Sequence, residues 1–395
     1  MQKQHIDLNL LRPSNREIST PNTQALIKWP GGKKREFSFI KHHIPAFDRY
    51  IEPFFGGGAI FFELQPERAA INDIAVELMD FYRFVGGKYN TKEFSKEIYE
   101  YVFNWEKIPN YILLFQRQFI SLYARYAADS ISKNDLRRLT EDYIHGQIQA
   151  FNGLFRADFC IDRNNLEKRI IDNLIDKITR VKKLEFSSGR ISIEDLHKNI
   201  ETAFRSGFYM HFRDVMNEKR GMNHISRAKA IANYYFIREF CYGSMFRFNA
   251  NGEFNIPYGG IGYNTKNFRK KVDRLFSLEA HNLLAGAVIY NEDFETFLNK
   301  LKLSSKDFIF LDPPYDTDFS DYEKKSFDRD DQFRLARYLY TTKAKFILVI
   351  KRTSFIYGLY KGKQNINISS FDKKYTYNMK GRNDRAVQHL IVKNF

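Results

Sequence analysis

A strand, a glycine turn and a helix follow one another near the start of the chain, and this pattern restricts the fold most. The segment "DRYIEPFFGGGAIFFEL", residues 48–64, is an apolar run, three glycines at 56–58 and a second apolar run. The segment "AAINDIAVELMDFYRFV", residues 69–85, predicts a short strand that ends at Asn72–Asp73 and then a helix. A βαβα beginning implies a parallel sheet with helices on its faces.

The pattern changes after about residue 90. Glycine and proline become sparse, and apolar residues recur at helical spacing. In "NNLEKRIIDNLIDKITRVKKL", residues 164–184, they predict a helix that Asn164 or Asn165 caps. In "SIEDLHKNIETAF", Ser192 and Asp195 have the spacing of a capping box. We therefore expect a mostly helical insert.

Strand signals return near the end of this block and continue to the C-terminus. In residues 246–259, "FRFNANGEFNIPYG", apolar residues alternate about an Asn-Gly pair, which predicts a β-hairpin. Four apolar strands then follow, in "GAVIYNEDF", "DFIFLDPPY", "KFILVIKRT" and "VQHLIVKNF". The predicted organisation is a loose arm at 1–25, one α/β domain made of 26–90 and 265–395, and an insert at 91–264.

The segment "FIFLDPPYDTDF", residues 308–319, places polar chemistry where a buried strand ends. Asp312 follows the strand at the carboxyl edge of the sheet, where open α/β sheets bind ligands. Pro313 and Pro314 stiffen the chain and keep their carbonyls as acceptors, and Tyr315 offers a flat ring. A carboxylate, a rigid carbonyl and an aromatic plate make a slot for a planar group with an NH₂, such as a nucleobase. A capped strand-end loop is the plainer interpretation.

The glycine turn and the acid after the second strand add a nucleotide pattern. Gly56, Gly57 and Gly58 allow close backbone approach at a helix start, although their spacing is not GxGxxG and argues against NAD. Asp73, at the end of the next strand, can accept hydrogen bonds from ribose hydroxyls. An ordinary tight turn and a helix cap remain alternatives for these residues.

Charge points to a polyanionic partner. The net charge is +16, and residues 341–395 carry 12 Lys and Arg against Asp372 and Asp384. Clustered cations of this kind neutralise phosphates. Two cysteines give no disulfide framework and no zinc spacing, and we predict no metal. Without a signal peptide or an apolar run near the ~18 residues of a membrane span, the expectation is a cytoplasmic protein with no membrane partner.

Five segments in order resemble the Dam-like, D12 class of adenine-specific DNA methyltransferases. They are "KWPGGKK" at 28–34, "YIEPFFGGGAIFFEL" at 50–64, "INDIAVEL" at 71–78, the hairpin at 246–259, and "YNEDFETF" at 290–297, and D-P-P-Y follows them. The likeness implies a Rossmann-like S-adenosylmethionine-dependent sheet with an inserted helical target-recognition domain that carries a DNA-contacting hairpin. A departure is the length of the insert, which also holds "FNGLFRADF" at 151–159, a fragment like the hairpin motif.

The resemblance also implies roles for single residues. S-adenosylmethionine would be contacted by Trp29, Lys33, Gly56, Gly58, Asp73, Asp293, Phe294 and Asp312. The target adenine would meet Asp312, Pro313 and Tyr315. Double-stranded DNA would be contacted by Lys28, Arg247, Asn249, Asn255 and Tyr258. Trp29 could equally fill the core, and Asp293 could be a helix cap.

The implied reaction is methylation of the adenine N6 amine in a specific duplex sequence after base flipping, in restriction-modification or in phage or host DNA modification. Methylation of structured RNA and a binding protein without catalysis remain alternatives. A cognate restriction endonuclease is a possible partner, and the sequence gives neither the recognition site nor the oligomeric state.

Overall fold

The computed structural model describes residues 24–151, 153–218, 225–245, 247–315, 327–374 and 386–395, without the side chains of 188, 374 and 386. A seven-stranded sheet has the order β3-β2-β1-β4-β5-β7-β6. Neighbours from β3 to β5 are parallel, whereas β7 is antiparallel to both β5 and β6. The strands are β1 Arg49–Glu52, β2 Ala69–Asn72, β3 Ala287–Tyr290, β4 Asp307–Leu311, β5 Lys345–Lys351, β6 Asn367–Lys374 and β7 Ala386–Lys393.

Alternate strand residues bury themselves on the two faces of the sheet. Ile309 and Leu311 of β4 pack on one face with α12 (Phe294–Lys300), α13 (Arg329–Thr341) and α14 (Ser354–Tyr360). Phe308 and Phe310 join the core on the other face, which contains α2 and α3. That face is covered by α1 (Phe37–Ile40), η1 (Lys41–His43), α2 (Ala59–Leu64) and α3 (Val76–Val85), with α11 (Leu278–Ala285) packed on α3. Burial on both faces explains why β4 and β5 read as continuous apolar runs.

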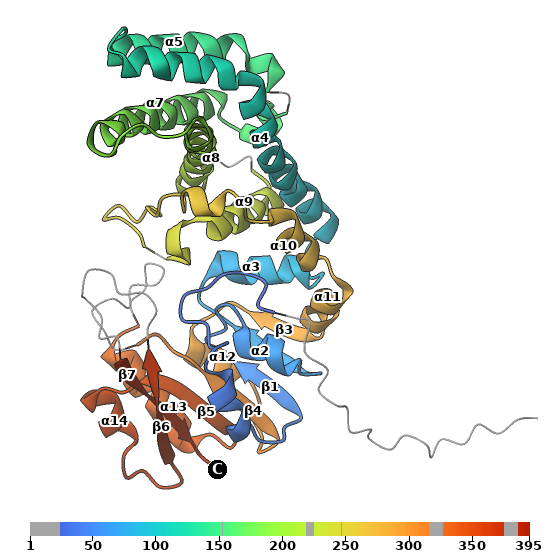
Figure 1. Ribbon diagram of the computed structural model, residues 1–395. Coiled ribbons are helices and arrows are strands. Elements are labelled where there is room, and N and C mark those ends of the chain that lie inside the picture. Colours follow the sequence, from blue (N-terminus) through green and yellow to red (C-terminus); the bar gives the residue numbers. More distant parts are fainter. Residues whose placement is uncertain (1–23, 152, 219–224, 246, 316–326, 375–385) are drawn as a thin grey trace, which may run out of the picture.

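The insert stands on this domain as an elongated stack of helices (Figure 1). Its helices are α4 Thr91–Ala127, α5 Lys133–Gly146, α6 Ala157–Cys160, α7 Arg163–Ser188, α8 Ile193–Asn217 and α9 Arg227–Phe240, with η2 Ile148–Ala150 between α5 and α6. α4 packs on α5, α8 and α9, and α7 packs along α8. α10 (Phe268–Leu275) contacts α4 and leads the chain back to α11 and the sheet.

Most sequence expectations for the elements are confirmed, and three differ. Ser192 caps α8 and accepts from the Asp195 backbone N–H at 3.0 Å, as expected. The cap of α7 is instead Asp162, which accepts from the Asn165 N–H at 2.9 Å. Among the described residues 247–259, the hairpin region has two isolated bridges, Phe248 to Phe254 and Tyr258 to Cys241, and no regular strands. Strand β6 has no clear apolar alternation, and the sequence did not predict it.

Candidate cofactor and DNA site

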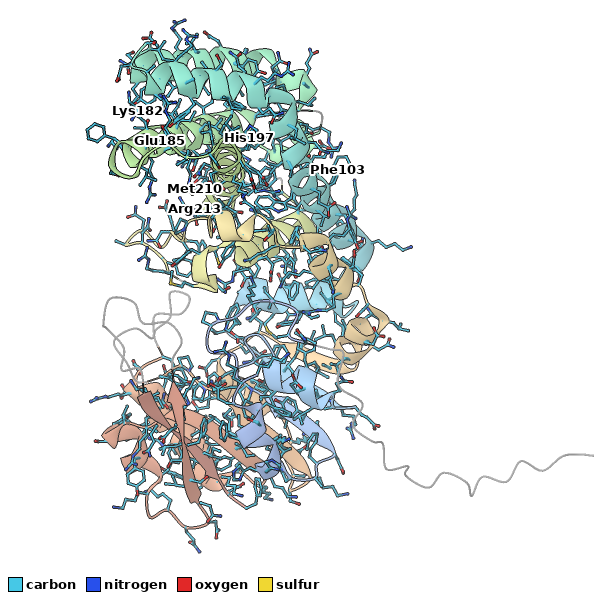
Figure 2. The ribbon with its side chains drawn as sticks, viewed as in Figure 1. Phe103, Lys182, Glu185, His197, Met210 and Arg213 are labelled. Carbon is cyan, nitrogen blue, oxygen red and sulfur yellow. The ribbon has the colours of Figure 1, made fainter. Side chains whose placement is uncertain are left out.

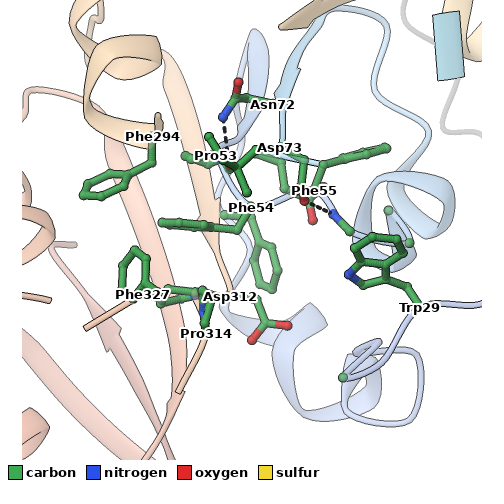
Figure 3. Close-up of a pocket in the computed structure, with 18 of the residues that line it drawn as sticks. Trp29, Pro53, Phe54, Phe55, Asn72, Asp73, Phe294, Asp312, Pro314 and Phe327 are labelled. Atoms are coloured by element: carbon green, nitrogen blue, oxygen red, sulfur yellow. Dashed lines mark hydrogen bonds between the residues drawn. The ribbon is translucent and has the colours of Figure 1, made fainter. Parts of the chain in front are cut away.

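A cavity of about 560 Å³ opens at the carboxyl ends of β1, β2 and β4. The chain order reverses here, because β1 lies between β2 and β4 in the sheet. This is the position where open α/β sheets bind ligands, and the volume is in the range of cofactor sites. The lining residues are 29–33, 52–60, 72–74, 292–294, 310, 312–315, 327 and 331. Figure 3 shows Trp29 at one end, Phe294 and Phe327 at the other, and Asp312 between them.

The glycine turn and Asp73 form one hydrogen-bonded unit. The Gly56 N–H donates to Asp73 Oδ2 at 2.8 Å, and the Ala75 N–H at the start of α3 donates to Oδ1 at 3.0 Å. Asp73 therefore ties the glycine turn to Ala75, the N-cap residue of α3, although no side chain caps this helix. Burial raises its pKa, and these backbone hydrogen bonds oppose the shift. Gly56 and Gly58 have positive φ, 49° and 63°. A Cβ on Gly56 would come within 2.7 Å of the Trp29 ring, so the turn also makes room for that side chain.

The Asp312 carboxylate lies against the ammonium of Lys33. Lys33 is 2% exposed and Asp312 is 19% exposed. Lys33 Nζ also donates to the Gly31 carbonyl at 3.0 Å and lies 5.4 Å from the Tyr315 ring centre. Burial raises the pKa of Asp312 and lowers the pKa of Lys33, and the attraction between the two groups opposes both shifts. Strongly shifted groups in a cavity mark a candidate catalytic centre.

Contacts from α13 and β7 hold the residues after Asp312 in place. Gln332 of α13 donates to the Pro314 carbonyl at 2.9 Å, so this acceptor is already used. Tyr315 packs edge-on against His389 of β7 with ring centres 5.3 Å apart. Burial lowers the pKa of His389 to about 3, and so the ring is a neutral support. The loop directly after Tyr315 lies outside the described residues.

An aromatic wall with an ion-pair network closes the other end. Phe294 lies 5.4 Å from Phe54 and 5.6 Å from Phe327 between ring centres. Asp293 caps α12, accepting from the Glu295 N–H at 3.0 Å, as its alternative role predicted. Arg334 Nη2 also donates to Asp293 at 2.7 Å. Asp293 still lines the cavity, with its side chain 40% exposed.

Two cavity residues escaped the sequence analysis. Glu52, the last residue of β1, is 3% exposed and accepts from the Tyr50 hydroxyl at 2.8 Å. Burial raises its pKa well above the usual value, and the nearby Asp312 and Asp73 add to the shift. Asn72 bridges two loops, donating to the carbonyls of Pro53 (3.1 Å) and Glu292 (3.0 Å). The signal for both was their place at a strand's carboxyl end, the rule that identified Asp312 and Asp73.

The predicted DNA-contacting residues divide into surface and support. Arg247 is exposed, and its Nε donates to Asn255 Oδ1 at 3.0 Å. Asn249 shapes the turn, because its Oδ1 accepts from the Asn251 and Glu253 N–H groups.

Tyr258 differs from the sequence expectation that it contacts DNA. It is 6% exposed and its hydroxyl donates to Asn264 at 2.8 Å. Its ring packs among buried aromatics of the insert, so Tyr258 supports the hairpin from beneath.

The end of α8 holds this hairpin. Asn217 donates to the Phe254 carbonyl at 3.0 Å and accepts from its N–H at 2.8 Å, as a neighbouring strand would. Tyr209 donates to the Ile256 carbonyl at 3.0 Å. Arg213, which Figure 2 labels beside Met210 on α8, reaches the same carbonyl at 3.5 Å.

Helix α9 joins the hairpin to the cavity. Arg238 is 1% exposed and donates to the carbonyls of Lys28 (2.9 Å) and Met245 (3.0 Å). Its guanidinium lies 5.5 Å from the Trp29 ring centre. One buried side chain therefore fixes both the segment that lines the cavity and the base of the hairpin.

The described residues contain neither a metal-binding cluster nor a membrane-spanning helix. No group of three or more His, Cys, Asp and Glu side chains there could hold a metal ion. Within the same residues, no helix is long and apolar enough to cross a membrane.

Comparison with known proteins agrees with this site. The model of the D12 class N6 adenine-specific DNA methyltransferase family matches residues 29–159 and 149–377. The chain is 27% identical over 275 residues to the Type II methyltransferase M.CviBI of Paramecium bursaria Chlorella virus NC1A, covering 67% of this chain and 96% of that protein. It is 24% identical over 396 residues to the Type II methyltransferase M.MjaIII of Methanocaldococcus jannaschii, covering 94% and 99%. It is 21% identical over 378 residues to a DNA adenine methylase of Vibrio cholerae, covering 93% and 95%. The chain belongs to the D12 class of N6 adenine-specific DNA methyltransferases.

Proposed function

We propose that the cavity at the ends of β1, β2 and β4 holds S-adenosylmethionine, the methyl donor that the family implies. The carboxyl groups that line the cavity fit this positively charged cofactor. Glu52, Asp73 and Asp312 bring three carboxyl groups to one cavity, which suits a ligand with a sulfonium and an ammonium. Asp73 would accept from the ribose hydroxyls, and Phe54 and Phe294, which also line the cavity, would contact the planar base. When bound, the cofactor supplies a methyl group activated by the positive sulfur.

We propose that Asp312, Pro313 and Tyr315 receive the target adenine. Gln332 already donates to the Pro314 carbonyl, so we propose the Pro313 carbonyl as the backbone acceptor beside Asp312. These two acceptors would hold both hydrogens of the N6 amine and draw its lone pair out of the ring, toward the methyl carbon. The bound cofactor would supply the methyl carbon for the new N–C bond, and the electron pair of its C–S bond would stay on sulfur. Asp312 lies ready to take the proton that N6 then releases.

In the free protein, Lys33 occupies the position proposed for the N6 amine of the target adenine. Its ammonium contacts the acceptor that the N6 amine would use and lies over the ring on which adenine would stack. We infer that Lys33 keeps Asp312 ionised and oriented before the base arrives, and moves aside when the base enters. A preformed carboxylate needs less reorganisation during methyl transfer.

The proposed substrate is double-stranded DNA from which the adenine is flipped. A buried slot at a strand end cannot reach an N6 amine inside the duplex, and flipping costs a few kcal/mol. Stacking on Tyr315 would return part of this cost. The proposed DNA contacts are Arg247, Asn255 and Lys28. Arg247 is exposed on the hairpin, and Lys28 directly precedes Trp29, which lines the cavity.

The single observation that carries this proposal is the convergence of Asp312, Asp73 and the glycine turn in one cavity. The test is transfer of labelled methyl groups from S-adenosylmethionine to duplex DNA and to structured RNA by the purified protein. Sequencing of the product would identify modified adenines and their context. Label on RNA alone, or on neither polymer, would contradict the proposal. Two relatives are named Type II methyltransferases, which supports a cognate restriction endonuclease as partner.

A further inference from the structure

Three lysines from separate segments converge on the end of α9. Lys271 of α10 lies with Nζ 3.0 Å from Glu239 Oε2, and Lys28 Nζ lies 3.6 Å from the same oxygen. Lys266 Nζ donates to the Glu239 backbone carbonyl at 3.0 Å. We call Lys28, Lys266, Lys271 and Glu239 the lysine cluster.

The cluster carries more positive charge than it neutralises. Glu239 is its one carboxylate, 1% exposed, whereas Lys28 and Lys271 are 30% and 33% exposed. Lys266 is half-buried with its Nζ 3.0 Å from the Tyr263 ring centre, and Lys28 Nζ lies 5.6 Å from the same centre. When Lys28 and Lys266 are both charged, their ammonium groups repel each other, and partial burial weakens the screening of that repulsion. The fully charged cluster is therefore unfavourable until an anion joins it, and this is typical of a binding site.

The place of the cluster indicates which anion. Lys28 directly precedes Trp29, which lines the cavity. The Tyr263 hydroxyl accepts from the Gly243 N–H at the base of the hairpin, 3.1 Å away. In Figure 1, α9 and α10 lie between the rest of the insert and α3. The lysine cluster therefore lies between the proposed target-base slot and the proposed DNA-contacting hairpin.

We propose that Lys28, Lys266 and Lys271 form a seat for a DNA backbone phosphate beside the flipped adenine. The inference rests on the proposed function, and it adds Lys266 and Lys271 to the DNA contacts. Lysine binds phosphate as a compact charge with rotatable donors, and such contacts position a duplex without reading its sequence. The phosphate supplies the negative charge that the cluster lacks, and Glu239 keeps the three side chains gathered.

A phosphate seat of this kind links DNA binding to proton uptake. Burial and the neighbouring Lys28 lower the pKa of Lys266 to about 6, and Glu239 opposes the shift. Lys271 adds repulsion, and the Tyr263 ring covers the group. Free Lys266 is then largely neutral at pH 7 to 8, and an adjacent phosphate raises its pKa. Binding takes up close to one proton, so affinity falls by up to about tenfold per pH unit above pH 6.

The experiment measures duplex binding by the full-length protein without turnover. Two fluorescein-labelled duplexes are titrated at about pH 6 and pH 8, one of random sequence and one containing the unmodified sequence that the enzyme methylates. Proton uptake on binding is measured by calorimetry in two buffers. Lys266→Met should lose the proton uptake on both duplexes, with a salt slope lower by about 1 at pH 6. Lys266→Arg should keep binding at pH 8 but lose the proton uptake, because arginine stays charged. Lys306→Met is the matched control, since Lys306 is an exposed lysine that pairs with Asp48 beside the start of β4.

Each outcome decides the proposal. Proton uptake that is unchanged in Lys266→Met, or absent in the wild type although DNA binds, would overturn the phosphate seat and leave the methyltransferase roles intact. Loss confined to the duplex with the sequence that the enzyme methylates would mean that Lys266 reads a base. No duplex binding at any pH would remove both the seat and the proposed DNA contacts.

Discussion

The carboxylate of Asp312 contacts the ammonium of Lys33, and in the proposed reaction it would also accept from the amine of the target adenine. We expect Asp312→Ala to lower methyl transfer by at least about 10²-fold, because an acceptor aimed at the reacting amine is lost. Asp312→Asn should fail as well, since its amide lacks the charge and can present a donor to an amine that needs acceptors. The measurement is labelled methyl transfer to DNA, with thermal unfolding as the control for folding. Near-normal turnover by either folded variant would remove Asp312 from the reaction.

Asp73 has a structural role in the glycine turn, and we propose a second role in binding the ribose of the cofactor. Asp73→Ala should weaken S-adenosylmethionine binding by about 1–3 kcal/mol, the cost of leaving buried hydrogen-bond partners unpaired. Part of the loss comes from the glycine turn, because the Gly56 N–H donates to this carboxylate. Calorimetry gives the affinity, and thermal unfolding of the free protein separates the two effects. Unchanged affinity with a lowered unfolding temperature would leave Asp73 only the structural role of tying the glycine turn to the segment before α3.

At the scale of elements, the hairpin is the proposed reader and α8 is its support. Arg247→Ala should cost about 1–3 kcal/mol preferentially on the cognate duplex if its guanidinium contacts a base edge. Binding to cognate and scrambled duplexes at several salt concentrations gives the answer. Equal losses on both would assign Arg247 to the backbone, and no loss on either would shift recognition to the helices of 91–240.

Asn217 tests the support separately. Asn217→Ala removes both hydrogen bonds to the Phe254 backbone, at a cost of about 1–3 kcal/mol in the insert. The freed hairpin should discriminate cognate from scrambled duplexes less well, while S-adenosylmethionine affinity stays unchanged. Unaltered discrimination would show that the hairpin keeps its shape without α8. A fall in cofactor affinity would instead point to the link through Arg238.

At the scale of the whole molecule, sequence reasoning was most reliable where one local rule decides. A buried run that ends in an acid identified Asp312 and Asp73, because the position of a strand end follows from local pattern. Contacts between distant segments were out of reach. Lys33 and Asp312 are 279 positions apart, and no spacing rule joins them. Tyr258 lies in a motif that resembles a DNA contact, yet its burial depends on aromatics from α4, α8 and α9 that only the fold brings together.

The same fold keeps a carboxyl group buried in the cavity at a cost to stability. Burial raises the pKa of Glu52 well above its usual value, so the folded chain holds a proton that the unfolded chain releases above about pH 4.3. Stability that this group contributes is present below that pH and falls as pH rises toward the folded pKa, by up to about 1.4 kcal/mol per pH unit. Glu52→Gln keeps an acceptor for the Tyr50 hydroxyl and does not titrate.

The cofactor-free Glu52→Gln variant should therefore match the wild type in unfolding temperature near pH 4 and exceed it at pH 8, by at least about 1 kcal/mol of unfolding free energy. S-adenosylmethionine should bind this variant more weakly at pH 8, because the proposed site loses a group that can ionise beside its positive charges. Thermal unfolding at both pH values, with and without the cofactor, measures both effects. Parallel pH profiles for the two proteins would mean that Glu52 is already ionised in the free protein. A gain in stability without any loss of affinity would separate the burial of Glu52 from cofactor binding.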